Sequence, residues 1–469
     1  METYKVPSHI DPNKIFLVNR SELEERLEAE YYRSEIKNII TKIKNKKFDI
    51  LRHITLPIKN GSTPDKGHFE ISGINYYRSQ DFSLYEFNYN QFITEKFNKK
   101  IIRSFSKKED ILLAVVGATL GKIGFINKFE QEGNINQNIA RIRIINKNFL
   151  PEYVAIFLNS IIGQKLIFRY ATITTQAYLN NEQLGKIPIP RIFKDIQQQI
   201  VDLYQEAYQQ KQQKEAEAKT LLESIDTYLL HELGITLPQK DNSLENRIFT
   251  TQFSEVSGSR LDPDYIIKYK YLTSQKATYE FKSLNDLLIC SPQYGANEES
   301  IQGNPFLDTR YIRITDIDEI GNLKVDSWKT ANKIEDKFLL KLNDILFARS
   351  GSVGKCYIHK DINIKAIFAG YLIRFVLNTE KCNPDFIFYY CNSSIYKFWV
   401  SAIERPAVQS NINSEEYKSL PIPLPPLEKQ NEIAEHIQGI RAQAKELQEQ
   451  AKKILEEAKQ EVEKMILGD

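Results

Sequence analysis

The residues that most resemble a catalytic set lie in the second half of the chain and have the spacing of a metal-dependent nuclease. Pro263-Asp264 precedes Glu280-Phe-Lys282, a loose pattern in which carboxylates hold Mg²⁺ and the lysine helps to activate water. About 233 residues earlier, Ala29-Glu30 and Lys47-Phe-Asp49 stand at the matching positions and reverse the charge at both Glu280 and Lys282. A Mg-dependent nuclease using Asp264, Glu280 and Lys282 is therefore kept only as an alternative.

Other catalytic patterns each lack a required residue. Gly117-Ala-Thr-Leu-Gly-Lys122 is one residue short of a phosphate-binding loop, and Ile123 stands where that loop needs Ser or Thr to hold magnesium. Asp262-Pro-Asp-Tyr265 and Asn383-Pro-Asp-Phe386 both lack the second proline of an amino-methyltransferase motif. The six histidines are scattered and have no metal-ligand spacing. We predict that this chain has no catalytic residue and binds neither a metal nor a cofactor.

The short motifs of the chain occur twice, in the same order. Asp110-Ile-Leu-Leu-Ala returns as Asp344-Ile-Leu-Phe-Ala, and a glycine turn ending in lysine follows each copy, at Lys122 and Lys355. Further pairs are Pro188-Ile-Pro190 with Pro421-Ile-Pro423, Gln197 with Gln430, and Tyr77-Arg78-x-x-Asp81 with Ile312-Arg313-x-x-Asp316. Because the offset stays between 233 and 235 residues throughout, the chain is an internal duplication.

Each copy reads as a globular segment of mixed helix and strand followed by one long helix. The prolines of Pro-Ile-Pro are expected to stop the sheet before the helix, and Ser21-x-x-Glu24 fits a capping box near the start of the chain. Alternating and β-branched runs predict strands at 111–116, 139–145, 345–348 and 371–377. The predicted domains are 1–190 and 236–425, with long helices at 191–235 and 426–469.

The two long helices carry an apolar seam with alternating spacings of four and three residues, which is typical of a coiled coil. The seam of the second helix includes Ile437 and Leu447, and that of the first includes Tyr204 and Leu221. Each helix follows an equivalent globular segment, so antiparallel pairing predicts a pseudo-twofold axis. The predicted fold class is α+β, with two tandem-repeat globular domains separated by two long antiparallel helices.

The charge of the chain is unevenly distributed. The net charge is only +2, yet residues 1–190 hold 28 Lys and Arg against 20 Asp and Glu, while each long helix has a net charge of −3. A basic segment suits contact with phosphate, and acidic helices suit protein partners. The four cysteines (Cys290, Cys356, Cys382 and Cys391) are predicted to be reduced core thiols in a cytoplasmic protein, and no apolar run suggests export or a membrane span.

Two variable globular segments, each ending in Pro-Ile-Pro and leading into a helix with an early Gln-x-x-Ile, resemble the specificity subunit of type I restriction–modification systems. The Asp-Ile-Leu strand with its Gly-Lys turn and Gly61-Ser-Thr-Pro64 are also similar to the target recognition domains of that family. The second copy departs from this pattern, with Ser291-Pro292 taken as the counterpart of Thr63-Pro64.

The resemblance implies a non-catalytic subunit. Residues 1–190 and 236–425 would be target recognition domains that each read one half of a split, asymmetric double-stranded DNA target, and the helices would set the spacer. Two modification methyltransferase subunits would dock on the helices, and a restriction/translocase subunit would join them. S-adenosylmethionine, ATP and Mg²⁺ are expected on those partners.

DNA-reading residues are expected on loops that carry basic and amide side chains, because these groups contact phosphates and base edges. The nominated residues are Arg78, Lys122, Asn136, Gln137, Gln176, Arg313, Arg349, Lys355 and Gln409. Tyr204, Leu221, Ile437 and Leu447 are nominated on the helices for partner binding. The two segments differ at most loop positions, which predicts two different half-sites. A coiled-coil scaffold or adaptor without DNA readout is the remaining alternative.

Overall fold

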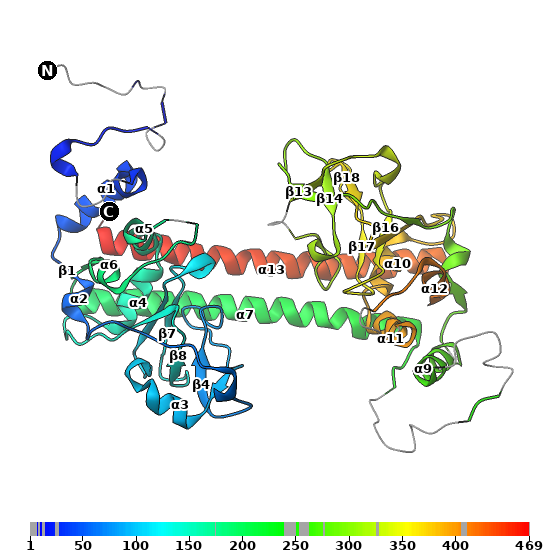
Figure 1. Cartoon of the computed structure of the whole chain (residues 1–469). Helices are drawn as coiled ribbons and strands as arrows, with labels where there is room; N and C mark the ends of the chain where they lie inside the picture. The colour runs from blue at the N-terminus through cyan, green and yellow to red at the C-terminus, as the bar shows by residue number, and fades with distance from the viewer. Residues whose placement is uncertain are drawn as a thin grey trace. The chain divides into compact units, whose positions relative to one another are not determined.

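A computed structural model describes residues 7, 10–11, 15–23, 28–173, 175–238, 250–252, 262–274, 277–324, 328–404 and 410–468 (Figure 1). The chain forms two compact units. Unit 1 comprises residues 1–214 and 449–469, and unit 2 comprises residues 215–448. Within the described ranges, no helix is both long and apolar enough to cross a membrane.

Unit 1 is built on two four-stranded sheets, with strand orders β2-β9-β6-β7 and β3-β5-β4-β8. Its strands are β1 (Phe48–Ile50), β2 (Lys59–Asn60), β3 (Phe69–Glu70), β4 (Ile74–Tyr77), β5 (Phe92–Ile93), β6 (Ile111–Ala114), β7 (Ile123–Phe125), β8 (Gly133–Ile135), β9 (Ile139–Ile142) and β10 (Pro188–Pro190). Its helices are α1 (Ser34–Lys44), α2 (Leu51–Ile54), α3 (Glu95–Lys100), α4 (Pro151–Asn159), α5 (Ile161–Tyr170) and α6 (Asn181–Gly185). The core lies where α4 and α5 pack against β6 and β7, and all four residues of β6 are buried.

Unit 2 repeats this plan, with the sheet β12-β19-β16-β17 in the place of β2-β9-β6-β7. Its strands are β11 (Phe281–Ser283), β12 (Gln293–Tyr294), β13 (Ser300–Gln302), β14 (Arg310–Ile312), β15 (Lys329–Ala331), β16 (Ile345–Ala348), β17 (Cys356–Ile358), β18 (Ala366–Phe368), β19 (Leu372–Phe375) and β20 (Pro421–Pro423). Its helices are α9 (Pro263–Ser274), α10 (Pro384–Tyr390), α11 (Ser394–Ile403) and α12 (Ser414–Lys418). The four strands predicted from the sequence are present as β6, β9, β16 and β19.

The Pro-Ile-Pro motifs form strands, which corrects the prediction that their prolines stop the sheet. β10 pairs antiparallel with β1, and β20 pairs antiparallel with β11. In unit 1, Leu51 donates its N–H to the carbonyl of Ile187 at 2.9 Å, just beyond the Pro188 pair. The prolines therefore lie at every second position of the strand, where the N–H group makes no hydrogen bond to the partner strand.

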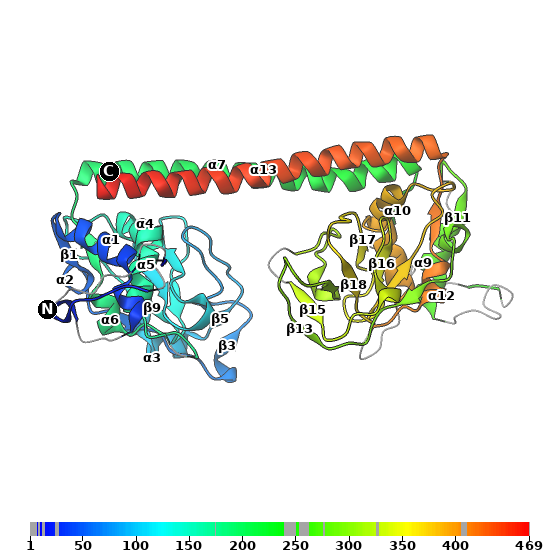
Figure 2. The ribbon, with the colours of Figure 1, turned by 90° about the horizontal axis from the view of Figure 1, so that it is seen from above.

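Two long helices, α7 (Lys194–Leu233) and α13 (Leu427–Leu467), contribute a part to each unit. Within unit 2, His436 contacts the ring of Tyr228 with centroids 4.3 Å apart, and Lys429 forms an ion pair with Glu232 at 3.0 Å. Residue numbers thus rise on one helix as they fall on the other, so the helices are antiparallel within this unit (Figure 2). The predicted seam is confirmed, because its apolar residues are buried or half-buried along both helices.

The far end of each long helix caps a shorter helix in the same unit. In unit 1, Glu463 of α13 accepts a hydrogen bond from the N–H of Ile162, in the first turn of α5, at 3.1 Å. In unit 2, Asp226 of α7 accepts one from the N–H of Ser394, at the start of α11, at 2.7 Å. Carboxylates satisfy free N–H groups and complement the helix dipole at such positions. Both caps fix the long helices against the globular part of their unit.

A fully buried glutamine near the start of each long helix forms a second, duplicated anchor. In unit 1, Oε1 of Gln197 accepts a hydrogen bond from the N–H of Leu150 at 2.8 Å, and Nε2 donates to the carbonyl of Asn148. In unit 2, Gln430 accepts from the N–H of Asn383 at 2.8 Å and donates to the carbonyl of Pro425 at 2.8 Å. The repeated Gln-x-x-Ile motif therefore joins the long helix to the start of α4 or α10.

One further sequence prediction lies partly outside the described residues, and another needs correction. The capping box near the start of the chain joins Asn19 to Glu22 around a short 3₁₀ turn, whereas the predicted box on Ser21 needed Glu24, which lies outside the described residues. Cys290 is exposed, because it lies in the loop before β12, and is not a core thiol; the other three cysteines are buried.

Candidate nucleic-acid interface

Two parallel strands bring nominated residues of unit 1 together. β4 and β8 pair in parallel with Tyr77 opposite Ile135, so Arg78 and Asn136 leave the sheet at the same edge. The N–H of Asn136 donates to the carbonyl of Tyr77 at 3.0 Å. Arg78, Asn136 and the exposed Gln137 therefore occupy one edge of the sheet.

The Gly-Ser-Thr segment lies against this edge, and only glycine permits the approach. A Cβ atom at Gly61 would be 1.7 Å from the carbonyl oxygen of Ile135, a distance that no side chain tolerates. Tyr76 donates its hydroxyl hydrogen to the carbonyl of Ser62 at 2.9 Å, and Asn60 donates from Nδ2 to the carbonyl of Gln137 at 3.2 Å. These bonds place the 60–63 segment beside the predicted reading residues.

A buried carboxylate holds Arg78 in place. Nε and Nη2 of Arg78 both donate to Asp81 at 2.9 Å, and this ion pair raises the pKa of the guanidinium. Lys122 reaches the same turn, because its Nζ donates to the carbonyl of Gln80 at 3.1 Å. Arg78 retains 30% side-chain exposure, and a phosphate contact from it or from Lys122 remains a prediction.

Unit 2 reproduces this arrangement. Arg313 forms the same two-pronged pair with Asp316, at 3.0 and 2.7 Å. Lys355 donates to the carbonyl of Ile317 at 2.9 Å and forms an ion pair with Glu319 at 2.8 Å. β14 and β18 pair in parallel, so Arg313 leaves the sheet beside Ala369.

Unit 2 also repeats the close contact between a glycine and a backbone carbonyl oxygen. This contact corrects one pairing that was made from the sequence alone. A Cβ atom at Gly295 would lie 2.3 Å from the carbonyl oxygen of Ala369, and Tyr311 donates its hydroxyl hydrogen to the carbonyl of Ala296 at 2.7 Å. Gly295 is therefore the counterpart of Gly61, and Ser291-Pro292 is not the counterpart of Thr63-Pro64. The sequence pairing was wrong because it compared residue types and did not use the register of the paired strands.

The side chains on this shared framework differ between the units. Strand register places Ala369 and Gly370 where unit 1 has Asn136 and Gln137. Three further equivalent positions differ. With the unit 1 residue given first, they are Asn60 and Tyr294, Val115 and Arg349, and Asn138 and Tyr371. The hydrogen bonds that hold the backbone recur in both units, whereas the side chains at this edge of the sheet differ between them.

The unit 2 face includes aromatic residues that the sequence reasoning missed. The guanidinium of Arg349 lies over the ring of Tyr294 at 4.9 Å from its centroid, and the side chain of Tyr371 is exposed. Tyr294 also makes a hydroxyl contact of 3.3 Å with Ser414. Matching the two copies by strand register would have found Tyr294 and Tyr371 opposite Asn60 and Asn138.

The remaining nominated residues differ in how the structure places them. Gln176 is exposed, with Nε2 3.4 Å from the position of a Cβ atom on Gly117, so it borders the glycine turn. Val115 bonds to Asn138 on one side and Leu179 on the other, which links the segments carrying Gln137 and Gln176. Gln409 lies outside the described residues.

The residues nominated on the helices need a correction. Tyr204 is 2% exposed and Ile437 is fully buried, because both belong to the seam that packs within their units, so neither forms an exposed partner surface. Leu221 and Leu447 are half-buried on the same seam. Partner binding by the helices stays a prediction, and it would have to use their exposed faces.

The nuclease pattern does not assemble as a site among the described side chains. Lys282 forms an ion pair with Glu280 at 2.9 Å, and both are exposed on or beside β11. The side chain of Asp264 lies outside the described set. Among the described residues, no group of three His, Cys, Asp or Glu side chains is arranged to hold a metal ion.

Comparisons with known proteins agree with this duplicated α+β fold. Residues 267–457 match the family model described as the type I restriction modification DNA specificity domain. The predicted resemblance to type I specificity subunits is thereby confirmed, and the nuclease and scaffold alternatives are not favoured.

Curated relatives are similar over part of the chain. The MjaVIII specificity subunit of Methanocaldococcus jannaschii is 30% identical over 140 residues, which is 28% of this chain and 33% of the relative. The putative MjaX specificity subunit of the same organism is 33% identical over 134 residues, which is 26% of this chain and 31% of the relative. The StySPI specificity subunit of Salmonella potsdam is 29% identical over 171 residues, which is 34% of this chain and 36% of the relative. Each match spans about a third of the relative's length.

A solved chain from a study of assembly and conformational transition of the type I restriction–modification system covers 90% of this chain and 97% of its own length. Its TM-score is 0.50 and its identity 12%, so this likeness concerns the fold alone. The predicted fold class, with two repeated globular parts and long helices, is confirmed at this level.

Proposed function

We propose that this chain is the DNA sequence-specificity subunit of a type I restriction–modification complex. In this proposal each unit reads one half of a split, asymmetric DNA target through the edge at the ends of β4 and β8, or of β14 and β18. One observation supports this proposal most strongly: the two units share the same backbone framework, but the side chains on it differ. Asn136 and Gln137 stand in unit 1 where Ala369 and Gly370 stand in unit 2, and amide side chains pair well with adenine edges.

Repeated residues suit a task that both units share. Arg78 with Arg313, and Lys122 with Lys355, are held at equivalent turns, which supports contacts to the phosphate backbone that any sequence offers. Residues that differ between the units suit base reading. Two different half-sites follow from this division.

The chain itself would be non-catalytic. Methyl transfer to a base inside a duplex requires flipping of that base into a cofactor pocket. We therefore assign S-adenosylmethionine to two modification methyltransferase subunits, and ATP and Mg²⁺ to a restriction/translocase subunit. These partners would bind the exposed, acidic faces of α7 and α13.

Reconstitution tests this proposal. The purified chain is mixed with its methyltransferase partner and DNA, and adenine methylation is mapped. Methylation confined to one bipartite sequence supports the proposal, whereas the partner alone should not methylate that sequence. Methylation with the same pattern in the presence and absence of this chain would favour the scaffold alternative.

A further inference from the structure

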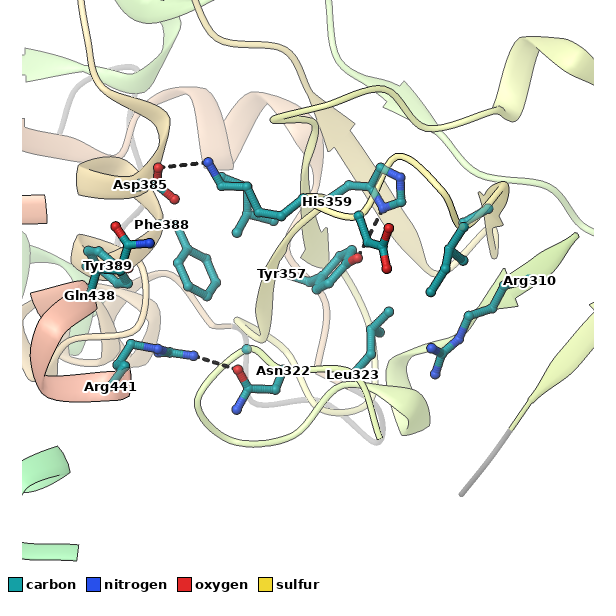
Figure 3. Close-up of a pocket in the computed structure, with 16 residues that line it drawn as sticks. Arg310, Asn322, Leu323, Tyr357, His359, Asp385, Phe388, Tyr389, Gln438 and Arg441 are labelled. Atoms are coloured by element: carbon teal, nitrogen blue, oxygen red, sulfur yellow. Dashed lines mark hydrogen bonds and ion pairs between the residues drawn. The ribbon is translucent and has the colours of Figure 1, made fainter. Parts of the chain in front are cut away.

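Unit 2 contains a cavity that the proposed DNA-reading edge does not use. Its volume is about 540 Å³, within the range of small-molecule sites. β14, β17, the loop before β18, the 321–323 loop, α10 and α13 line it (Figure 3). Several separate segments of this one unit therefore line an open pocket.

A buried guanidinium without an ion-pair partner lies in its wall. Arg310 is 5% exposed, and its Nη2 donates to the carbonyl of Lys324 at 2.7 Å. Its Nε is buried without a hydrogen-bond acceptor, and no ion pair joins Arg310 to a carboxylate among the described residues, although Asp316, the partner of Arg313, acts on it electrostatically. Burial lowers the pKa of this guanidinium. A buried cation is costly unless an anion compensates it.

A second arginine faces the same cavity from α13. Arg441 donates to the side chain of Asn322 at 2.6 Å and to the carbonyl of Ile320 at 3.1 Å, and its guanidinium lies over the ring of Phe388 at 5.4 Å. Among the described residues it also forms no ion pair, although the carboxylate of Asp318 acts on it electrostatically. In Figure 3, Arg310 and Arg441 extend from opposite sides toward the loop that carries Asn322 and Leu323.

The other charges of the lining leave the cavity positive. Lys360 is paired with Asp385 at 2.7 Å, so that pair contributes little net charge. Asp361 is exposed at the rim and accepts a hydrogen bond from the N–H of Asn363. Within the lining, its single charge does not balance both arginines. The buried His359 contacts the hydroxyl of Tyr357 at 3.1 Å and adds a polar wall.

Two residues that line the cavity have no counterpart in unit 1. Gly124 stands where unit 2 has Tyr357, and a Cβ atom there would lie 2.7 Å from the ring of Phe82 and 3.1 Å from that of Phe87. Asn75 replaces Arg310 in the parallel strand register, so the buried cation is missing as well. The repeated framework therefore does not supply Tyr357 and Arg310 in unit 1.

We infer that this cavity binds a phosphate group through the guanidinium groups of Arg310 and Arg441, which both line it. Planar guanidinium groups bind phosphate oxygens through paired, charge-assisted hydrogen bonds. The phosphate would supply the negative charge that no ion pair gives to Arg310 or Arg441. Its source is either a small molecule or the backbone of bound DNA, and the chemistry of recognition is the same.

The test uses the full chain without DNA or partner subunits, so its outcome does not depend on the proposed function. Trp328 stacks on Arg310 with 4.9 Å between guanidinium and ring, so its fluorescence reports occupancy. The chain is titrated with inorganic phosphate, with ADP and with a short DNA duplex at constant ionic strength. Saturable quenching by phosphate or ADP assigns a small molecule, and saturable quenching by the duplex alone assigns the DNA backbone.

Matched variants separate this site from general electrostatics. Arg310→Gln and Arg441→Gln should each weaken binding roughly tenfold or more, because each removes a charge-assisted bond. Lys333→Gln, which removes an exposed cation of the same unit outside the cavity and away from the proposed DNA-reading edge, should bind as the wild type does. Because Arg310→Gln alters the core, the half-buried Arg441 gives the safer variant. Thermal unfolding with and without phosphate provides a second readout. No saturable signal with any probe, or equal affinity in both cavity variants and the wild type, would overturn the inference.

Discussion

Replacing Gln430 with alanine should destabilise unit 2 by an amount that its contacts define. The change removes the hydrogen bond from the N–H of Asn383 and the bond to the carbonyl of Pro425, each 2.8 Å long. Each lost bond costs about 0.5–1.5 kcal/mol, and partners left without water cost more, so the sum is about 3 kcal/mol. For a unit of this size, that corresponds to a fall in Tm of about 6–12 °C.

The two tryptophans make the assay specific to one unit. Trp328 and Trp399 both lie in unit 2, so thermal unfolding followed by tryptophan fluorescence reports on that unit. Gln443→Ala is the control, because Gln443 is an exposed glutamine on the same helix. Gln197→Ala should instead destabilise unit 1, which circular dichroism detects.

The expected result is a clear fall in the fluorescence midpoint for Gln430→Ala and a shift near zero for Gln443→Ala. Equal midpoints for these two variants would refute the view that the buried glutamine anchors α13 to α10. The repeated Gln-x-x-Ile motif would then need another explanation.

Three further predictions concern stability. Burial lowers the pKa of His359 below its ordinary 6.5, although Asp344 and Asp361 act in the opposite sense. As the pH falls below 6.5, the unfolded chain therefore binds a proton at this histidine before the native state does. The stability of unit 2 should therefore be fully present above pH 6.5 and decline as the pH falls below it, and His359→Gln should flatten that slope in urea titrations. Asp110→Asn should cost unit 1 about 3 kcal/mol in the circular dichroism transition, because it breaks the 2.6 Å ion pair of a fully buried carboxylate with Arg143. Ile437→Ala should cost unit 2 about 2–5 kcal/mol by fluorescence, whereas Glu435→Ala on the exposed face should leave the midpoint unchanged.

Much of the fold was predictable because its signals are local or repeated. The Asp-Ile-Leu strands, the helix seams and the constant offset all follow from short hydrophobic patterns that recur. The Pro-Ile-Pro strands were not predictable in this way, since proline normally ends a sheet. Their pairing depends on alternate positions of a partner strand, which no local pattern of Pro188 or Pro421 reveals.

The candidate interface was only partly predictable. The repeated Arg-x-x-Asp spacing of Arg78 and Arg313 was visible, but that a buried carboxylate holds each guanidinium requires the folded turn. The approach of Gly61 to Ile135 joins segments more than 70 residues apart. For the same reason the cavity around Arg310 was missed, because its wall comes from segments that are distant in the sequence.

The central claim is that each unit reads its own half of the DNA target, and one measurement tests it directly. Methylated motifs are mapped by genome-wide methylation sequencing in cells that express the chain with its methyltransferase partner, either unaltered or with Asn136→Ala and Gln137→Gly. Asn148→Ala, which removes an exposed amide elsewhere in unit 1, serves as the control. The account predicts that the double variant relaxes or changes one half of the bipartite motif and leaves the other half intact. An unchanged motif, or equal loss of both halves in a folded protein, would contradict it.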